Sequence, residues 1–247
     1  LSRLSCLFSQ VKIVYTMSAQ VAASSFQTVS SLETLLTTPF QGMVNAVCWN
    51  RELTGDFSEI ISKTPLEGKI TVIDPAELRQ LDLSKQGQIA REILLNDFDT
   101  LTALGAAPTI NIITSYERDD SFPFFPTDVY SFHVDRSPIP IATYLCTYYG
   151  DSSEILPNEQ AEQKIRIPEI RNELKKLYDG APEDFDAFLT EHFFDLHYRP
   201  KVQAQPIRCG LGHVWKIAVD HPTSTVPPCI HRAPEEHSGK RRLLLIC

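Results

Sequence analysis

Hydrophobic residues recur every three or four positions through residues 84–105, which is the spacing of one face of an α-helix. The apolar positions of this stretch are Ile89, Ile93, Leu94, Phe98, Leu101 and Leu104. Ser84 suits the N-cap and Gly105 suits the C-terminal end. Shorter helices are expected at 31–36, at 54–62 and after Pro75, with short strands at 43–49 and 69–73 between them. The first hundred residues are therefore predicted to be mainly helical.

From residue 109 the pattern changes to short apolar runs separated by turns that contain Pro, Gly or Asp. The expected strands are 109–115, 129–135, 139–149, 194–198, 207–211, 213–219, 229–232 and 241–247. About eight short strands are what a double-sheet jelly roll or cupin-like barrel needs. A helical insertion at 160–192 interrupts them, with Pro168 and Pro182 at favoured first positions of helices. The predicted fold class is α+β.

The predicted organisation is one domain over residues 31–247. In it, 31–105 is a helical support and 109–247 is the β-barrel with its insertion. Residues 1–30 lack a periodic apolar pattern and are expected to be a loose extension. The segment Leu1–Thr16 begins without methionine, so Met17 is an alternative start.

The formal net charge of −8 argues against a nucleic acid or an anionic membrane surface as the main partner. No apolar run approaches the length of a membrane span. The six cysteines show no paired spacing, which indicates reduced, mostly buried thiols and a cytoplasmic location. The oligomeric state is left open by the sequence.

His133 and Asp135 lie two positions apart in the predicted strand 129–135, so their side chains are expected on one face. One imidazole and one carboxylate are two of the three ligands of a 2-His-1-carboxylate Fe(II) site. His231, in the predicted strand 229–232, is the candidate third ligand. A His-x-Asp pair arises readily by chance in a chain with seven histidines, and its position in a strand is what favours a metal site.

Arg241 lies ten positions after His231, at the start of the last predicted strand. Together, His133, Asp135, His231 and Arg241 resemble the pattern of the 2-oxoglutarate/Fe(II)-dependent dioxygenase superfamily. The chain also resembles an uncharacterised bacterial branch of proteins with such a site, which leaves the primary substrate unidentified. The resemblance implies a double-stranded β-helix fold, Fe(II) on the three ligands and 2-oxoglutarate held by the arginine. It also implies hydroxylation of a C–H bond of an unidentified small-molecule or peptide substrate.

The cosubstrate site has two departures from the superfamily pattern. Members often carry a serine two positions after the arginine, where this chain has Leu243, and Arg242 competes with Arg241 for the inward position. The ten-residue spacing favours Arg241. Asn111 and Tyr144, on predicted strands, are candidates to hydrogen-bond the cosubstrate, and ordinary strand packing is the alternative for each.

Two arginines directly follow proposed ligands. Because neighbouring strand residues face opposite ways, Arg136 and Arg232 should point away from the metal and form structural ion pairs.

Three other interpretations compete with the oxygenase. Zinc ligand types occur at Cys209, His213, Cys229 and His231, but their spacings do not match the usual structural knuckles. A non-catalytic, cupin-like protein that binds or senses a metal is the second alternative. An interaction module is the third, in which the insertion 160–192 is a docking surface; in the enzyme the same insertion is a candidate lid. Hydrolase elbows and phosphate-binding loops are absent from the sequence.

Overall fold

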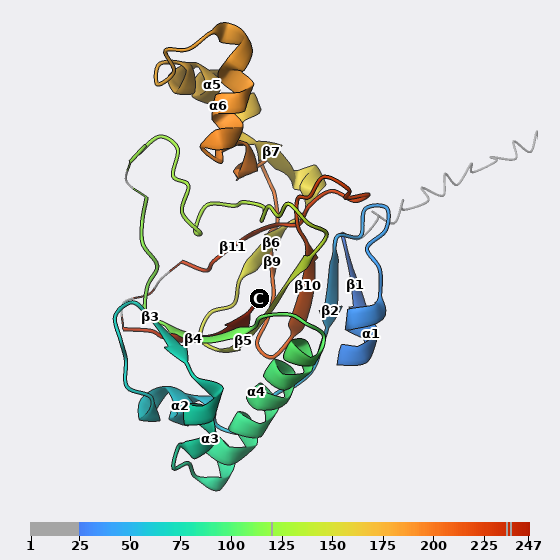
Figure 1. Cartoon of the computed structure of the whole chain (residues 1–247), viewed down its shortest axis with the longest axis vertical. Coiled ribbons are helices and arrows are strands. Elements are labelled where there is room, and N and C mark those ends of the chain that lie inside the picture. The colour runs from blue at the N-terminus through green and yellow to red at the C-terminus, as the bar shows by residue number, and fades with distance from the viewer. Residues whose placement is uncertain (1–24, 120, 236, 238) are drawn as a thin grey trace, which may run out of the picture.

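The computed structural model describes residues 25–119, 121–235, 237 and 239–247, and it is an α+β structure built on one large mixed sheet (Figure 1). This major sheet has seven strands in the order β1-β2-β10-β5-β12-β4-β3. They are β1 (Phe26–Val29), β2 (Ala46–Trp49), β3 (Ile70–Ile73), β4 (Thr109–Ile113), β5 (Ala142–Tyr149), β10 (Val214–Ala218) and β12 (Arg242–Ile246). β1 and β2 pair parallel, and the other pairs are antiparallel. Strands from both halves of the chain therefore share one sheet.

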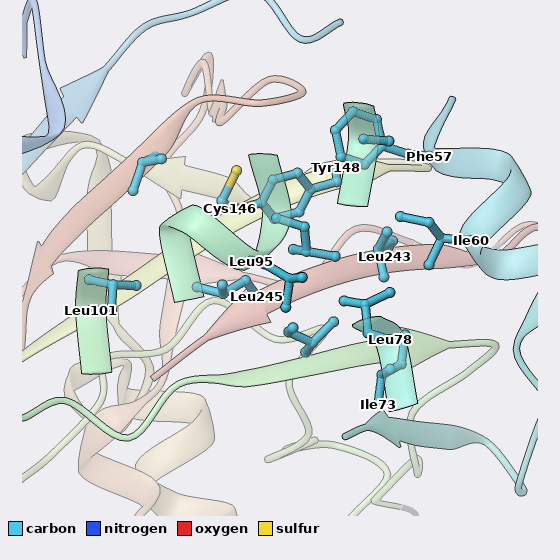
Figure 2. Close-up of a cluster of buried hydrophobic side chains, with 14 of the residues drawn as sticks. Phe57, Ile60, Ile73, Leu78, Leu95, Leu101, Cys146, Tyr148, Leu243 and Leu245 are labelled. Atoms are coloured by element: carbon cyan, nitrogen blue, oxygen red, sulfur yellow. The ribbon is translucent and has the colours of Figure 1, made fainter. Parts of the chain in front are cut away.

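Four helices from the first half pack on one face of the major sheet. They are α1 (Leu32–Thr37), α2 (Phe57–Lys63), α3 (Pro75–Gln80) and α4 (Lys85–Ala103). Their apolar side chains form one buried cluster with those of β5 and β12, and Figure 2 shows Phe57, Ile60, Leu78 and Leu95 facing Tyr148 and Leu243. The long helix predicted at 84–105 is confirmed, and its N-cap Ser84 accepts a hydrogen bond from the Gly87 amide at 3.2 Å.

A second β layer lies over the opposite face of the major sheet. This minor sheet has the order β11-β6-β9, with β11 at Ile230–Arg232, β6 at Glu154–Leu156 and β9 at Ile207–Arg208. Ile155 of β6 is buried in the same cluster as Leu145 of β5 and Trp215 of β10. Side chains that face this cluster therefore occupy the interior between the two β layers.

The segment 158–200 extends the chain beyond these layers, and its helices lie at the top of Figure 1. It contains a two-stranded sheet, β7 (Ala161–Gln163) with β8 (Tyr198–Pro200), and the helices α5 (Pro168–Lys175) and α6 (Phe185–Glu191). Short 3₁₀ turns occur at Asn158–Gln160, Lys164–Arg166, Pro182–Asp184 and Phe194–Leu196. The helices have their own core, in which Phe125, Leu174 and Phe194 are buried. None of the described helices is long and apolar enough to cross a membrane.

The prediction of a regular strand at 129–135 is wrong. A turn bonds the Ser131 amide to the Asp128 carbonyl at 3.1 Å, and Pro138 follows shortly after. What remains is an extended segment held by isolated bridges, in which His133 pairs with both His231 and His197. The segment continues the minor sheet beyond β11. No sheet of the described residues closes into a barrel, so the structure supports an α+β fold in which helices cover one face of the major sheet and the minor sheet covers the other.

Three further expectations about the elements and their boundaries need correction. Residues 26–29 form β1, although the sequence predicts a loose extension up to residue 30; Leu1–Thr16 and Met17 lie outside the described residues. The region 31–105 also supplies β2 and β3, so it is part of the sheet as well as its helical cover. The predicted strand 194–198 begins as a 3₁₀ turn, Phe194–Leu196.

Candidate metal centre

The structure brings His133, Asp135 and His231 together, with one ligand atom of each within 4.8 Å of the others. His133 and His231 exchange both backbone hydrogen bonds, each at 2.9 Å, so they form a directly opposed antiparallel pair. Side chains of such a pair project from the same face, and the two imidazole centroids lie 4.6 Å apart. Backbone pairing therefore places two ligands side by side, and Asp135 follows two positions later.

The contacts of each imidazole leave the same nitrogen facing the other ligands. His133 Nδ1 lies 2.7 Å from the Ser131 carbonyl oxygen, and His231 Nδ1 lies 3.2 Å from that of Cys229. A carbonyl only accepts, so both Nδ1 atoms carry the proton and both Nε2 atoms have a free lone pair. A histidine that donates Nδ1–H to a carbonyl is the usual partner arrangement for a metal ligand.

The carboxylate is oriented in the same way. Thr143 Oγ1 donates to Asp135 Oδ2 at 2.6 Å, while Asp135 Oδ1 lies 3.7 Å from His231 Nε2. Burial, together with the neighbouring His231, lowers the pKa of His133 to about 4. His133 is therefore neutral near pH 7, the form that binds a metal ion. Two neutral imidazoles and one carboxylate fit a divalent cation such as Fe(II).

A pocket of about 310 Å³ leads to these ligands. His133 and Asp135 lie in its wall, together with Asp128, Phe193 and His197. Phe193 follows α6, so the insertion supplies one side of the pocket, as expected of a lid. Through this pocket, a second molecule could reach a metal ion bound at His133 and Asp135.

Arg242, and not Arg241, is the arginine that turns inward. Arg242 is 6% exposed and lies on the face of β12 that packs between the β layers, whereas Arg241 precedes the strand and is exposed. Spacing alone selected the wrong neighbour, because ten residues do not determine which face a strand presents. Gly150, with φ +88°, allows the close approach at this point, since a Cβ there would clash with the Arg241 carbonyl oxygen.

The partners of the Arg242 guanidinium are hydroxyl groups. It donates to Thr147 Oγ1 at 2.9 Å and to Ser153 Oγ at 2.7 Å, and it lies 3.5 Å from the Tyr116 hydroxyl. No carboxylate pairs with it among the described residues. Burial lowers its pKa from the ordinary value, yet an arginine stays charged at neutral pH. Hydroxyls satisfy its N–H groups without balancing its charge, which favours binding of an anion.

The metal ligands and Arg242 face the same interior. His231 is directly opposite Ile155, which is buried between the layers, and Ser153 lies two positions before Ile155 on the same face. On β5, Thr143 contacts Asp135 and Thr147 contacts Arg242, again from one face. The two sites are therefore neighbours along the interior of the β layers.

Tyr144 and Asn111, the two other candidates to bind the cosubstrate, lie away from the metal ligands and from Arg242. Tyr144 packs in the cluster under the helices, on the face of β5 opposite Thr143, and does not reach the interior. Asn111 is buried on the inner face of β4, where its side-chain amide donates to Thr109 Oγ1 at 2.9 Å. The structure does not bring either side chain into contact with the metal ligands or Arg242.

The arginines after the ligands form structural ion pairs, as predicted. Arg136 pairs with Asp195 at 2.7 Å and with Asp220 at 2.8 Å, and Arg232 donates to Glu154 at 2.8 Å. The structure does not bring the four candidate zinc ligands together. In the described residues, one group of His, Cys, Asp and Glu can hold a metal ion, and Cys209, His213 and Cys229 are not in it.

Several residues of the site carried no recognisable signal in the sequence. Thr143, Thr147 and Ser153 are ordinary strand or turn residues, and only the three-dimensional pairing gives them partners. Lys164 lies in the insertion, and His197 follows the 3₁₀ turn Phe194–Leu196 and lines the metal pocket. No family model matches the chain, and no curated protein or solved structure shows significant similarity to it.

Proposed function

We propose that this protein is an Fe(II)- and 2-oxoglutarate-dependent oxygenase, and that its two β layers form a double-stranded β-helix. One observation carries the proposal. The three candidate metal ligands and the buried Arg242, which pairs with no carboxylate among the described residues, face the same space between the two β layers. A dicarboxylate that chelates a metal at one end and pairs with a guanidinium at the other would use both.

The donor set suits Fe(II). His133 Nε2, His231 Nε2 and Asp135 Oδ1 would hold the ion and would leave coordination positions open for other ligands. With Fe(II) and 2-oxoglutarate bound there, dioxygen would be the oxidant: one of its oxygen atoms would hydroxylate the C–H bond, and the other would enter succinate as 2-oxoglutarate loses CO₂.

The chain's own residues bind and orient. Thr143 holds the Asp135 carboxylate, and the Ser131 and Cys229 carbonyls hold the imidazoles in the metal-binding tautomer. Arg242, arranged by Thr147 and Ser153, would pair with the distal carboxylate of the cosubstrate. The pocket beside Phe193 would admit the primary substrate.

An anaerobic Fe(II) titration in the presence of 2-oxoglutarate tests the proposal. The expected result is a metal-to-ligand charge-transfer absorption in the wild type that is lost in His133→Ala and Asp135→Ala. Metal binding without a response to 2-oxoglutarate would favour the non-catalytic, metal-binding alternative. Absence of stoichiometric Fe, Mn and Zn in elemental analysis of the purified protein would contradict both the oxygenase and the non-catalytic, metal-binding protein.

A further inference from the structure

A third histidine lies beside the metal ligands. His197 is 4% exposed, forms a backbone bridge with His133, and has its ring centroid 6.0 Å from that of His133. It is not among the residues whose ligand atoms converge. It lines the metal pocket, so its role must lie in what enters that pocket.

Ser131 connects this histidine to a buried lysine. Lys164 Nζ donates to Ser131 Oγ at 2.6 Å, and Ser131 Oγ lies 3.3 Å from His197 Nδ1. An ammonium only donates, so Ser131 accepts from Lys164 and its own hydroxyl proton is free to donate to His197 Nδ1. The opposite arrangement would leave the Ser131 hydroxyl proton without an acceptor. His197 is therefore held with its proton on Nε2.

The two edges of the His197 ring face different spaces. Ser131 and Lys164 line an outer groove of about 430 Å³ that does not include His197, whereas His197 lines the metal pocket, which does not include them. Ser131 occupies the Nδ1 edge, which leaves the Nε2–H edge as the one available to the metal pocket that His197 lines.

The remaining lining residues indicate what this donor would meet. Asp128 and Asp135 line the pocket, and the one described Arg or Lys of its wall, Arg136, is held by Asp195 and Asp220. Apart from a bound metal ion, a carboxylate would find no free Arg or Lys side chain in this described wall, whereas a neutral carbonyl oxygen would accept from His197.

Phe193 adds an apolar contact at the pocket mouth. It is 58% exposed and has φ 59°, a left-handed conformation that favours glycine. The left-handed backbone costs free energy that the exposed ring does not recover by burial in the fold, which points to a role in binding.

We propose that His197 binds the primary substrate by donating Nε2–H to a neutral carbonyl oxygen, next to an apolar group that contacts Phe193, while Lys164 and Ser131 position it. The inference rests on the proposed function for the identity of the pocket as the substrate site. Its test uses neither metal nor cosubstrate, so that the two can fail separately.

The tautomer is measured first, on the full-length metal-free chain labelled with ¹⁵N-histidine. A long-range ¹H–¹⁵N spectrum should show His197 protonated at Nε2, with its signals assigned by their loss in His197→Gln. Ser131→Ala removes the hydroxyl and keeps the carbonyl that holds His133, so it should mix the His197 tautomers. An Nδ1–H tautomer in the wild type, or no effect of Ser131→Ala on it, would overturn the proposal.

The acceptor is tested with two probes of matched length, N-butylacetamide and hexanoate. The amide should shift the His197 Nε2–H signal saturably and bind more tightly than hexanoate. His197→Leu should weaken amide binding at least fivefold, whereas His197→Gln, which keeps an N–H donor, should retain it. Tighter binding of hexanoate, unchanged amide binding in His197→Leu, or no binding of either probe would each contradict the assignment.

Discussion

His133 and His231 form a hydrogen-bonded antiparallel pair, with both N–H···O distances at 2.9 Å. The two candidate ligands are 98 positions apart in the sequence, and their side chains meet because the backbone pairs them in this register. A shift by one residue would turn one imidazole to the other face. The geometry of the metal site is therefore a property of the minor sheet, not of a flexible loop.

Metal binding should stabilise the fold. The ligands come from separate segments, so an ion bound to the native state and not to the unfolded chain contributes about 2.7 kcal/mol when its concentration is 100 times the Kd. For a domain of this size, that corresponds to a rise in Tm of roughly 5–11 °C. Differential scanning fluorimetry with Mn(II) and with EDTA measures it. A rise of equal size in Asp135→Ala would show that the ion binds elsewhere.

Thr143→Val should weaken metal binding without unfolding the protein. The substitution keeps the β-branched shape and removes the hydroxyl that donates to Asp135 at 2.6 Å. Loss of such an outer partner typically lowers metal affinity about 10- to 100-fold. Calorimetric titration with Mn(II) tests this. Thr147→Val is the matched control, since Thr147 contacts Arg242 on the same strand and should leave metal affinity unchanged.

The helix-covered face contains a buried ion pair whose loss should be costly. Asp97 accepts from Arg51 and from the Tyr148 hydroxyl, and its side chain is 2% exposed. Asp97→Ala leaves the Arg51 charge buried without its partner, which should cost about 3–5 kcal/mol. The exposed pair Arg79–Asp99 provides the control, because Asp99→Ala should cost less than about 1 kcal/mol in the same urea denaturation series. Equal losses for both variants would contradict this account of the core.

Four cysteines should be unreactive in the native protein. Burial raises the thiol pKa of Cys48 and Cys146 to about 12, and it also raises that of Cys209 and Cys229. A raised pKa leaves almost no thiolate at pH 8, and the thiolate is the reactive form. Mass spectrometry after iodoacetamide treatment should find these four unmodified until guanidinium is added. Rapid native labelling of Cys209 or Cys229 would show that the two β layers open.

Phe193→Gly should leave the stability of the protein unchanged or raise it by up to about 1 kcal/mol. Its left-handed backbone, φ 59°, is unfavourable for phenylalanine and available to glycine. The more flexible unfolded chain of the glycine variant offsets part of that gain. Thermal unfolding measures the sign. A loss of more than about 2 kcal/mol would instead show that the exposed ring supports the fold.

The sequence predicted the long helix and the metal ligands better than the details around them. Periodic apolar residues determine α4, since burial of one face decides where a helix forms. The three ligands predicted for the metal site, His133, Asp135 and His231, also converge, although the regular strand expected at 129–135 is an extended, bridged segment. Short strands such as β1 and β6 were missed, because three or four residues carry too little alternation to be recognised.

Other failures have a physical cause in tertiary pairing. The His133 segment is extended but bridged at single residues, so its β-branched composition overstated its regularity. Arg242 turns inward because its partner across the sheet, Ile113, faces the interior, and no spacing from His231 encodes that pairing. Thr147 and Ser153 acquire a role only through the fold.

The most direct measurement compares the two neighbouring arginines in the anaerobic Fe(II) and 2-oxoglutarate titration. Arg242→Met removes the buried guanidinium, whereas Arg241→Met removes the exposed guanidinium of the neighbouring residue. Loss of a charge-assisted pair in a buried site should weaken 2-oxoglutarate binding by at least about tenfold in Arg242→Met. Fe(II) affinity should be unchanged in both variants, and Arg241→Met should match the wild type throughout. Equal 2-oxoglutarate affinity in Arg242→Met and the wild type would contradict the account.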